Sequence, residues 1–176
     1  MKKVLYPILL MWLSIFFACS SPEQNLIKNI ETLEKELFTN VTGIVDHDKA
    51  LTLVQLYIEY ADTYPDSDLA AEYLFRAGDV SMNTAYPHRA VDLFLRVHRD
   101  YPMYEKSPES LFLSAFVMEN QLANHQRAEL TYKRFLELYP DHDLADDAEI
   151  LLQHLGKSPD ELVREFEERL RAQEGL

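Results

Sequence analysis

The sequence predicts an all-α protein, a helical-repeat solenoid of about eight helices behind an N-terminal signal peptide. A Tyr-Pro pair recurs at Tyr64, Tyr101 and Tyr139, at intervals of 37 and 38 residues. Periods of this size are typical of stacked helical units. An aromatic residue stands eight positions before each of the three prolines. Only four glycines occur in 176 residues, which disfavours a turn-rich β fold.

The first residues predict a targeting signal. Lys2 and Lys3 precede a 14-residue apolar run over 4–17, and Ala18-Cys19 follows. This segment resembles a bacterial lipoprotein signal, which implies cleavage of residues 1–18 and palmitate-type acyl chains on Cys19, the only cysteine. The apolar run is roughly 21 Å long as a helix, whereas a hydrocarbon core needs about 30 Å. A plain secretory signal with a chance cysteine is the alternative.

Residues 19–45 are expected to form a lipidated N-terminus, a first amphipathic helix and a linker. Within the helix expected at 23–39, Leu26, Ile30, Leu33 and Leu37 recur at a helical spacing. The stretch 40–45 contains Gly43 and reads as the linker.

Residues 46–157 carry the repeats. We expect helices at 46–63, 67–83, 87–100, 108–122, 125–138 and 143–155. Small residues at Gly78, Ala90, Ala115 and Ala128 allow close helix approach, and the proline of each of the three repeated Tyr-Pro pairs ends the second helix of a pair.

These residues form a recognisable motif. It reads Leu74-x2-Ala77-Gly78, Ala90-x3-Phe94 and Pro102, and then Ala115, Ala128-x3-Tyr132 and Pro140. The pattern resembles the tetratricopeptide repeat, which implies stacked helix pairs. The first unit is only half present, because Leu53 replaces its small alanine.

Residues 158–176 are expected to form a C-terminal capping helix. Ser158 and Glu161 make a capping box, and Gly156 suits the end of the preceding helix. The expected helix at 159–173 would bury its apolar face and close the open end of the solenoid. That face consists of Leu162, Val163, Phe166 and Leu170.

Charge excludes several partners. The net charge is −13, and removal of Lys2 and Lys3 with the signal makes it −15. Such a surface repels the phosphates of nucleic acid and does not dock on anionic lipid through basic residues. The 158 residues that remain suffice for one domain with its own core.

Motifs for catalysis or metal binding are lacking in the sequence. It has no Gly-rich phosphate loop and no Gly-x-Ser-x-Gly elbow. The triplets at 46–48 and 141–143, both Asp-His-Asp, resemble metal ligands, but both fall at expected helix starts, where aspartate caps free N–H groups. We therefore expect no catalytic residue, no metal and no cofactor. An enzyme stays an alternative that would need histidines and acids gathered in a cleft.

The tetratricopeptide resemblance also implies a binding groove. In that family the first helix of each pair lines a groove that takes a partner segment. The positions carried over are Phe75, Asp79, Met82, Phe112, Phe116 and Glu119. The alternative for the phenylalanines is packing against neighbouring helices. Arg76 is the one basic residue near these positions, which disfavours a clamp for a partner's C-terminal carboxylate.

The expected function is that of a non-enzymatic, lipid-anchored scaffold that binds envelope proteins. Ser20 follows Cys19 in place of the aspartate that often retains lipoproteins at the inner membrane, so we expect the outer membrane, facing the periplasm. The repeats resemble those of the lipoprotein of the β-barrel assembly machine and of a periplasmic coordinator of cell-wall synthesis and division. Two alternatives stay open: a periplasmic small-molecule carrier or sensor, with a closed apolar pocket, and an adaptor in cell-wall synthesis or division.

Overall fold

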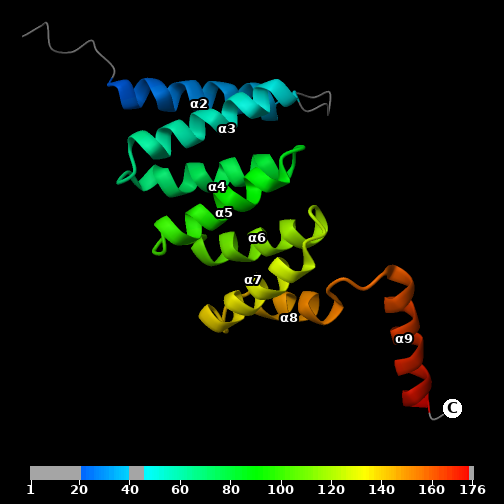
Figure 1. Ribbon diagram of the computed structural model, residues 1–176. Helices are drawn as coiled ribbons and strands as arrows, with labels where there is room; N and C mark the ends of the chain where they lie inside the picture. Colours follow the sequence, from blue (N-terminus) through cyan, green and yellow to red (C-terminus); the bar gives the residue numbers. More distant parts are fainter. Residues whose placement is uncertain (1–20, 40–45, 175–176) are drawn as a thin grey trace, which may run out of the picture.

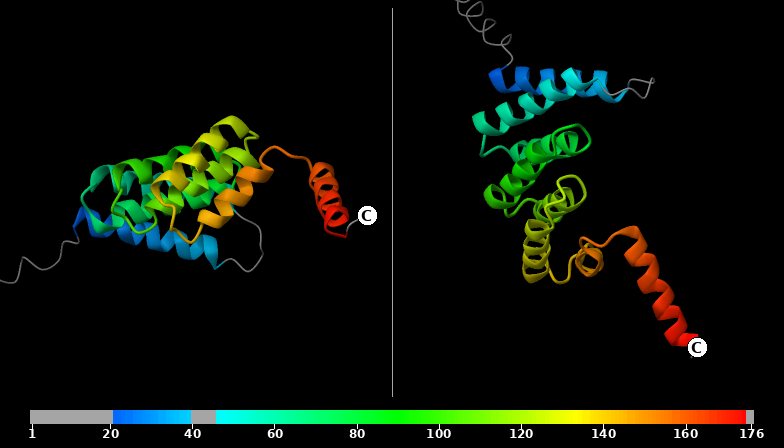
Figure 2. Two further views of the ribbon diagram at one scale, coloured as in Figure 1. Left: turned by 90° about the horizontal axis from the view of Figure 1, so that it is seen from below. Right: turned by 45° about the vertical axis from the view of Figure 1, so that its right-hand side comes forward.

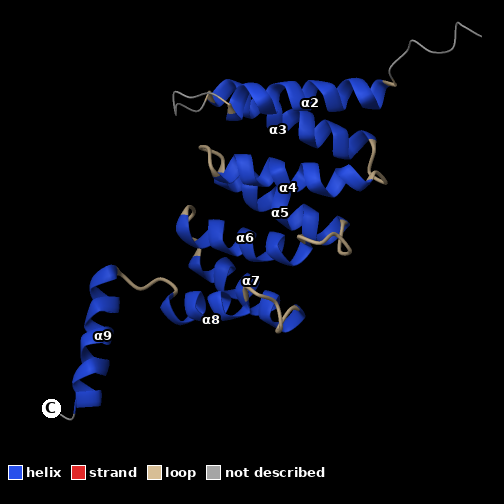
Figure 3. Cartoon of the chain, turned by 180° about the vertical axis from the view of Figure 1, so that it is seen from behind, coloured by secondary structure: helices blue, strands red, loops and turns tan. Residues whose placement is uncertain are grey.

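The computed structural model describes residues 21–39 and 46–174, and within them the chain forms eight helices and no strand (Figure 3). The helices are α2 (Pro22–Phe38), α3 (His47–Thr63), α4 (Asp68–Met82), α5 (Pro87–Asp100), α6 (Ser107–Asn120), α7 (His125–Leu138), α8 (Ala145–His154) and α9 (Pro159–Glu174). The all-α repeat architecture is thus confirmed, with helix ends close to those expected. The signal at 1–18, Cys19 and the linker at 40–45 lie outside the described residues.

Consecutive helices from α2 to α8 pack against one another as a stack of hairpins (Figure 1). Two ion pairs show how the hairpins are layered. Arg76 of α4 reaches Glu34 of α2 at 2.8 Å, and Arg96 of α5 reaches Asp62 of α3 at 2.6 Å. The first helices of successive hairpins therefore lie in one row and the second helices in another, as in a tetratricopeptide-like solenoid.

The Tyr-Pro pairs end the second helices. Tyr64, Tyr101 and Tyr139 are the C-caps of α3, α5 and α7, and each has an extended φ between −127° and −135°. A proline disfavours helical geometry in the residue before it and has no N–H to continue the helix. One local signal therefore sets the length of each hairpin.

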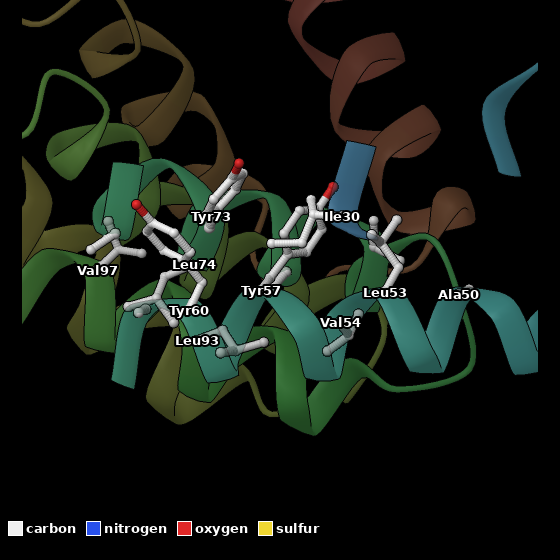
Figure 4. Close-up of a cluster of buried hydrophobic side chains, with 14 residues drawn as sticks. Ile30, Ala50, Leu53, Val54, Tyr57, Tyr60, Tyr73, Leu74, Leu93 and Val97 are labelled. Carbon is white, nitrogen blue, oxygen red and sulfur yellow. The ribbon is translucent and has the colours of Figure 1, made fainter. Parts of the chain in front are cut away.

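The first core cluster fills the space between α2, α3, α4 and α5, and tyrosines form its centre (Figure 4). The Tyr57 and Tyr73 rings stack with centroids 5.4 Å apart, and Tyr60 meets Tyr73 edge-on at 4.8 Å. The buried hydroxyls of Tyr57 and Tyr60 donate to Glu34 and Glu23 of α2 at 2.6 Å. These bonds hold α2 on the stack while satisfying buried polar atoms.

Close packing within a hairpin depends on Gly78. A Cβ placed on Gly78 of α4 would lie 2.7 Å from the ring of Phe94 of α5. Phe94 is fully buried, so the ring has no free space to move into. The expected role of this small residue is confirmed.

The outer side of α8 carries exposed polar residues and one exposed apolar residue, Ile150, which is 53% exposed. Counted from the preceding proline, Glu149 and Gln153 stand where earlier hairpins have Leu74 and Gly78, the positions that face the second helix. Both residues are exposed in α8. On its other side Ala148 is fully buried in a second core cluster, which includes Phe94 of α5, Phe112 of α6 and Phe135 of α7. Helix α8 therefore covers the second core cluster, and Ile150 is the one large apolar side chain that it exposes.

The expected packing of the last helix is wrong. Helix α9 forms, and its predicted capping box is present, with Ser158 N–H donating to Glu161 at 2.7 Å. The helix stands away from the stack in all views (Figures 1 and 2). The Val163, Phe166 and Leu170 side chains are 57%, 59% and 41% exposed. These exposed fractions show that the apolar face of α9 does not pack against the stack.

Of the two Asp-His-Asp triplets expected to cap helix starts, only the first does so through an aspartate. Asp46 caps α3 as expected, accepting from the Lys49 N–H at 3.1 Å. At the start of α8 it is the His142 ring, not an aspartate, that accepts from a backbone N–H, that of Leu144, at 3.1 Å. Among the described helices, none is long and apolar enough to cross a bilayer.

Candidate partner-binding face

The candidate face is the side of α4 and α6 on which five of the six predicted groove residues lie. Phe75, Asp79 and Met82 share one side of α4, because spacings of four and three bring them into line. Phe116 and Glu119 lie on α6. We call these five residues the first-helix face. Phe75, Met82 and Phe116 all pack partly against the second core cluster and are only half-buried, so apolar surface remains accessible.

Phe112 does not belong to this face. Its side chain is 7% exposed, and its ring lies 5.6 Å from those of Tyr132 and Phe135 in α7. The prediction of Phe112 as a groove residue is therefore wrong, because the ring fills the space between the two helices of its own hairpin. Phe75 holds the same repeat position in α4 but remains half-buried.

Phe75 lies between core and surface. Its ring meets Phe94 with centroids 5.7 Å apart and Tyr104 at 6.4 Å. The Lys106 ammonium lies over the ring, 4.9 Å from its centroid. This cation–π contact places a positive charge beside the apolar part of the face.

Arg76 does not offer a free charge. Its guanidinium pairs with Glu34 of α2 at 2.8 Å and with Glu72, one turn back on α4, at 2.7 Å. Hydrogen bonds and the charges of these carboxylates raise the pKa of Arg76 despite the opposing effect of partial burial. Because two carboxylates already pair with the Arg76 guanidinium, a carboxylate of a partner protein would gain little from binding to it. Arg76 is therefore already paired within the chain.

Glu72 joins α4 to the loop before α6. Its carboxylate accepts from the Tyr104 hydroxyl and lies 3.5 Å from the Lys106 ammonium. Burial alone would raise the pKa of Glu72, but the hydrogen bonds from Tyr104 and Arg76 lower it below its usual value. In this Arg76 network two acidic side chains, Glu34 and Glu72, therefore lie against two basic ones, Arg76 and Lys106.

Two further carboxylates complete the face. Asp79 is exposed and accepts from the Asn83 amide at 3.1 Å. Glu119 accepts from the Tyr132 hydroxyl at 2.9 Å, and burial together with this carboxylate raises the pKa of Tyr132. Because the Arg76 network is balanced, Asp79 and Glu119 give the first-helix face a negative potential beside its apolar patches.

Sequence reasoning missed the partners of Arg76. The Glu72–Arg76 pair has the i, i+4 spacing that a helix brings together, so it could have been found. Glu34 is 42 residues from Arg76, and Tyr104 is 32 from Glu72. No local pattern marks such contacts, because they depend on how one hairpin stacks on the next.

His98 faces two hydroxyl groups. His98 Nδ1 lies 3.3 Å from the Ser107 hydroxyl and 3.4 Å from that of Tyr139. Burial lowers the pKa of His98, and the positive charge of Arg134 adds to this effect. Among the described residues, no three His, Cys, Asp or Glu side chains are grouped so that they could hold a metal ion.

One open surface hollow is lined by none of the five residues of the first-helix face. It has a volume of about 530 Å³ and separates the loop after α3 from the loop after α5. Asp66, Asp68, Asp100 and Glu105 line it, and Met103 beside them is 94% exposed. It is an open and acidic hollow between two loops, unlike the closed apolar pocket that a small-molecule carrier needs.

Comparison with known proteins identifies no relative, because no protein family and no curated protein matches the chain. The likeness to tetratricopeptide proteins rests on the repeat motif and on the stacked helical hairpins.

Proposed function

We propose that the protein is a lipid-anchored, non-enzymatic scaffold that binds an apolar, partly basic segment of another envelope protein through the first-helix face. The observation that carries the proposal is the composition of that face. Half-buried Phe75, Met82 and Phe116 offer apolar contact area, and Asp79 and Glu119 flank it with negative charge. Interfaces of this kind gain affinity from aromatic anchors and selectivity from the charged rim.

The anchor is supported by the sequence of residues 1–20. A lipid on Cys19 would contribute about 0.8 kcal/mol per buried methylene, so two or more acyl chains would hold the protein on the bilayer. We place it at the outer membrane, facing the periplasm. Labelling cells with palmitate should mark the wild-type protein and leave Cys19→Ser unlabelled. Equal label in both would refute the lipid anchor without affecting the binding proposal.

The binding proposal is tested by crosslinking in cells. A photo-reactive amino acid is placed at Asp79 or Phe116, and at Asp92 of α5 as a matched control. Asp92 is an exposed helical position in the row of second helices. We expect the same partner protein to be captured from positions 79 and 116 and not from 92. Capture from none of the sites, or equally from all three, would contradict the proposal.

A further inference from the structure

We propose that a basic side chain of the partner protein, lysine or arginine, enters a small pocket beside Asp79. The pocket has a volume of about 200 Å³ and lies between the ends of α2 and α4, beside the start of α3. Both helices end at the same edge of the stack (Figure 1). Asp79 lines the pocket, so the pocket continues the first-helix face. The proposal rests on the partner binding proposed above, and it names the chemical group that the face recognises.

The pocket has an apolar and a polar part. Leu37, Ala50 and Val80 give it an apolar lining, and Asp79 and Asn83 give it a polar one. A pocket for a whole small molecule usually exceeds roughly 300 Å³. The smaller volume here suits one basic side chain, whose aliphatic stem packs on the apolar lining while its charged end stays near water.

The Asp79 carboxylate is available for a cation. It accepts a hydrogen bond from the Asn83 amide at 3.1 Å, and no residue that the structure describes forms an ion pair with it. Lys49, which precedes Ala50 in α3, is held by Glu36 of α2 at 2.8 Å. Within the described ranges, the chain therefore supplies no counter-ion for Asp79.

The position of Asp79 is unfavourable in the helix dipole. Asp79 stands in the last turn of α4, as Glu119 does in the last turn of α6, and neither turn holds a basic residue. The carboxyl end of a helix carries a partial negative charge, which disfavours acids and favours cations. A cation in the pocket would therefore meet both the Asp79 carboxylate and the negative end of α4.

Phe38 adds an aromatic ring to the lining. Its side chain stands at the end of α2 and is 65% exposed. An accessible ring attracts a nearby cation. An apolar side chain would gain the same contact area but would leave Asp79 without a partner, and an acidic one would be repelled. Charge complementarity therefore selects a basic residue.

Binding of a single amino acid tests the pocket without the partner. The probe is Nα-acetyl-lysinamide, and Nα-acetyl-norleucinamide has the same four-carbon stem without the ammonium group. Each is titrated against the full chain in mild detergent while NMR follows the methyl signals of Val80. We expect the lysine derivative to shift these signals with a Kd roughly five-fold below that of the norleucine derivative. Equal affinities, or no shift, would overturn the proposal.

Matched variants identify the charge that acts. Asp79→Asn changes an exposed side chain and should bring the affinities of the two probes to within about two-fold of each other. Asp92→Asn removes one acid from an exposed position of α5 and should behave like the parent. An Asp79→Asn chain that keeps the preference for lysine, or an Asp92→Asn chain that loses it, would overturn the proposal.

Crosslinking in cells separates the pocket from the function proposed above. A photo-reactive amino acid at Thr84, which also lines the pocket, leaves Asp79 in place. We expect it to capture the partner that position 116 captures, at a segment with a lysine or arginine. Glutamine in place of that basic residue should abolish capture at position 84.

The other outcomes are distinct. Capture of a partner at 116 but not at 84, or capture at 84 of residues 40–45 of this chain, would overturn the pocket and leave the first-helix face. No capture at either position, with the lysine probe still bound, would refute partner binding and leave the pocket's preference for a basic group.

Discussion

At the scale of single residues, small side chains fix the distance between helices. Gly78 lies against the Phe94 ring, and Ala90, Ala115 and Ala128 are all fully buried at matching positions. In a close-packed interior, one added methyl group at such a contact displaces a neighbour. The small residues of the repeat motif therefore mark the positions at which neighbouring helices are in contact.

Gly78→Ala should therefore destabilise the protein. Overpacking costs about 1–3 kcal/mol, and the better helix propensity of alanine returns up to about 1 kcal/mol, so we expect a net loss of about 1 kcal/mol in urea unfolding. In a Phe94→Leu background the smaller side chain leaves room, and the added methyl should cost nothing or stabilise. The same cost in both backgrounds would show that the Phe94 contact does not explain the glycine.

Residue patterns predicted the site only in part. Phe75 and Phe112 hold the same repeat position, yet the first reaches the surface and the second is buried between α6 and α7. The repeat motif cannot separate them, because the difference depends on the rings that face each one. Phe75 meets Lys106 from the following loop, whereas Phe112 meets Tyr132 and Phe135.

At the scale of helices, the periodicity of apolar residues predicts that α9 covers the end of the stack. In the structure α8 covers it instead. Helix α9 has the stronger amphipathic pattern, but α8 covers the stack, with Ala145 and Ala148 buried and Glu149 and Gln153 exposed. The pattern of α9 correctly predicted a helix with an apolar side. It could not reveal what that side packs against, because periodicity describes one helix and not its neighbour.

Removing α9 should leave the solenoid almost as stable as before. A chain that ends after Ser158 loses no buried apolar packing with the stack, so its thermal midpoint should fall by no more than about 2 °C. A chain that ends after Asp143 also loses α8 and uncovers Phe135 and its neighbours, and its midpoint should fall by roughly 10 °C. Circular dichroism measures both. An equal fall in the two chains would mean that α9 does pack on the stack.

At the scale of the whole molecule, the protein is a short linear stack with two core clusters. The first lies between α2 and α5 and the second extends to α8, and Phe75 contacts both. Sequence signals predicted this architecture well, because helix ends depend on local caps and prolines. The ion pairs between hairpins were not predictable, since Arg76–Glu34 and Arg96–Asp62 join residues 42 and 34 positions apart.

A linear stack should lose stability locally. Phe135→Ala opens a cavity in the second cluster and should cost about 3–5 kcal/mol, and Leu53→Ala should cost about 2–5 kcal/mol in the first. Both side chains are fully buried.

In hydrogen exchange, Phe135→Ala should strip amide protection from α6, α7 and α8 before α3, and Leu53→Ala should do the reverse, because each hairpin contacts only its neighbours. If either substitution lowered protection equally from α3 to α8, the two clusters would behave as one cooperative core. The first-helix face, which bridges α4 and α6, would then be as rigid as the centre of the protein. Under the local behaviour expected here, that face joins two segments that can open separately, so a partner bound across it should protect α6 and α7 more than α3.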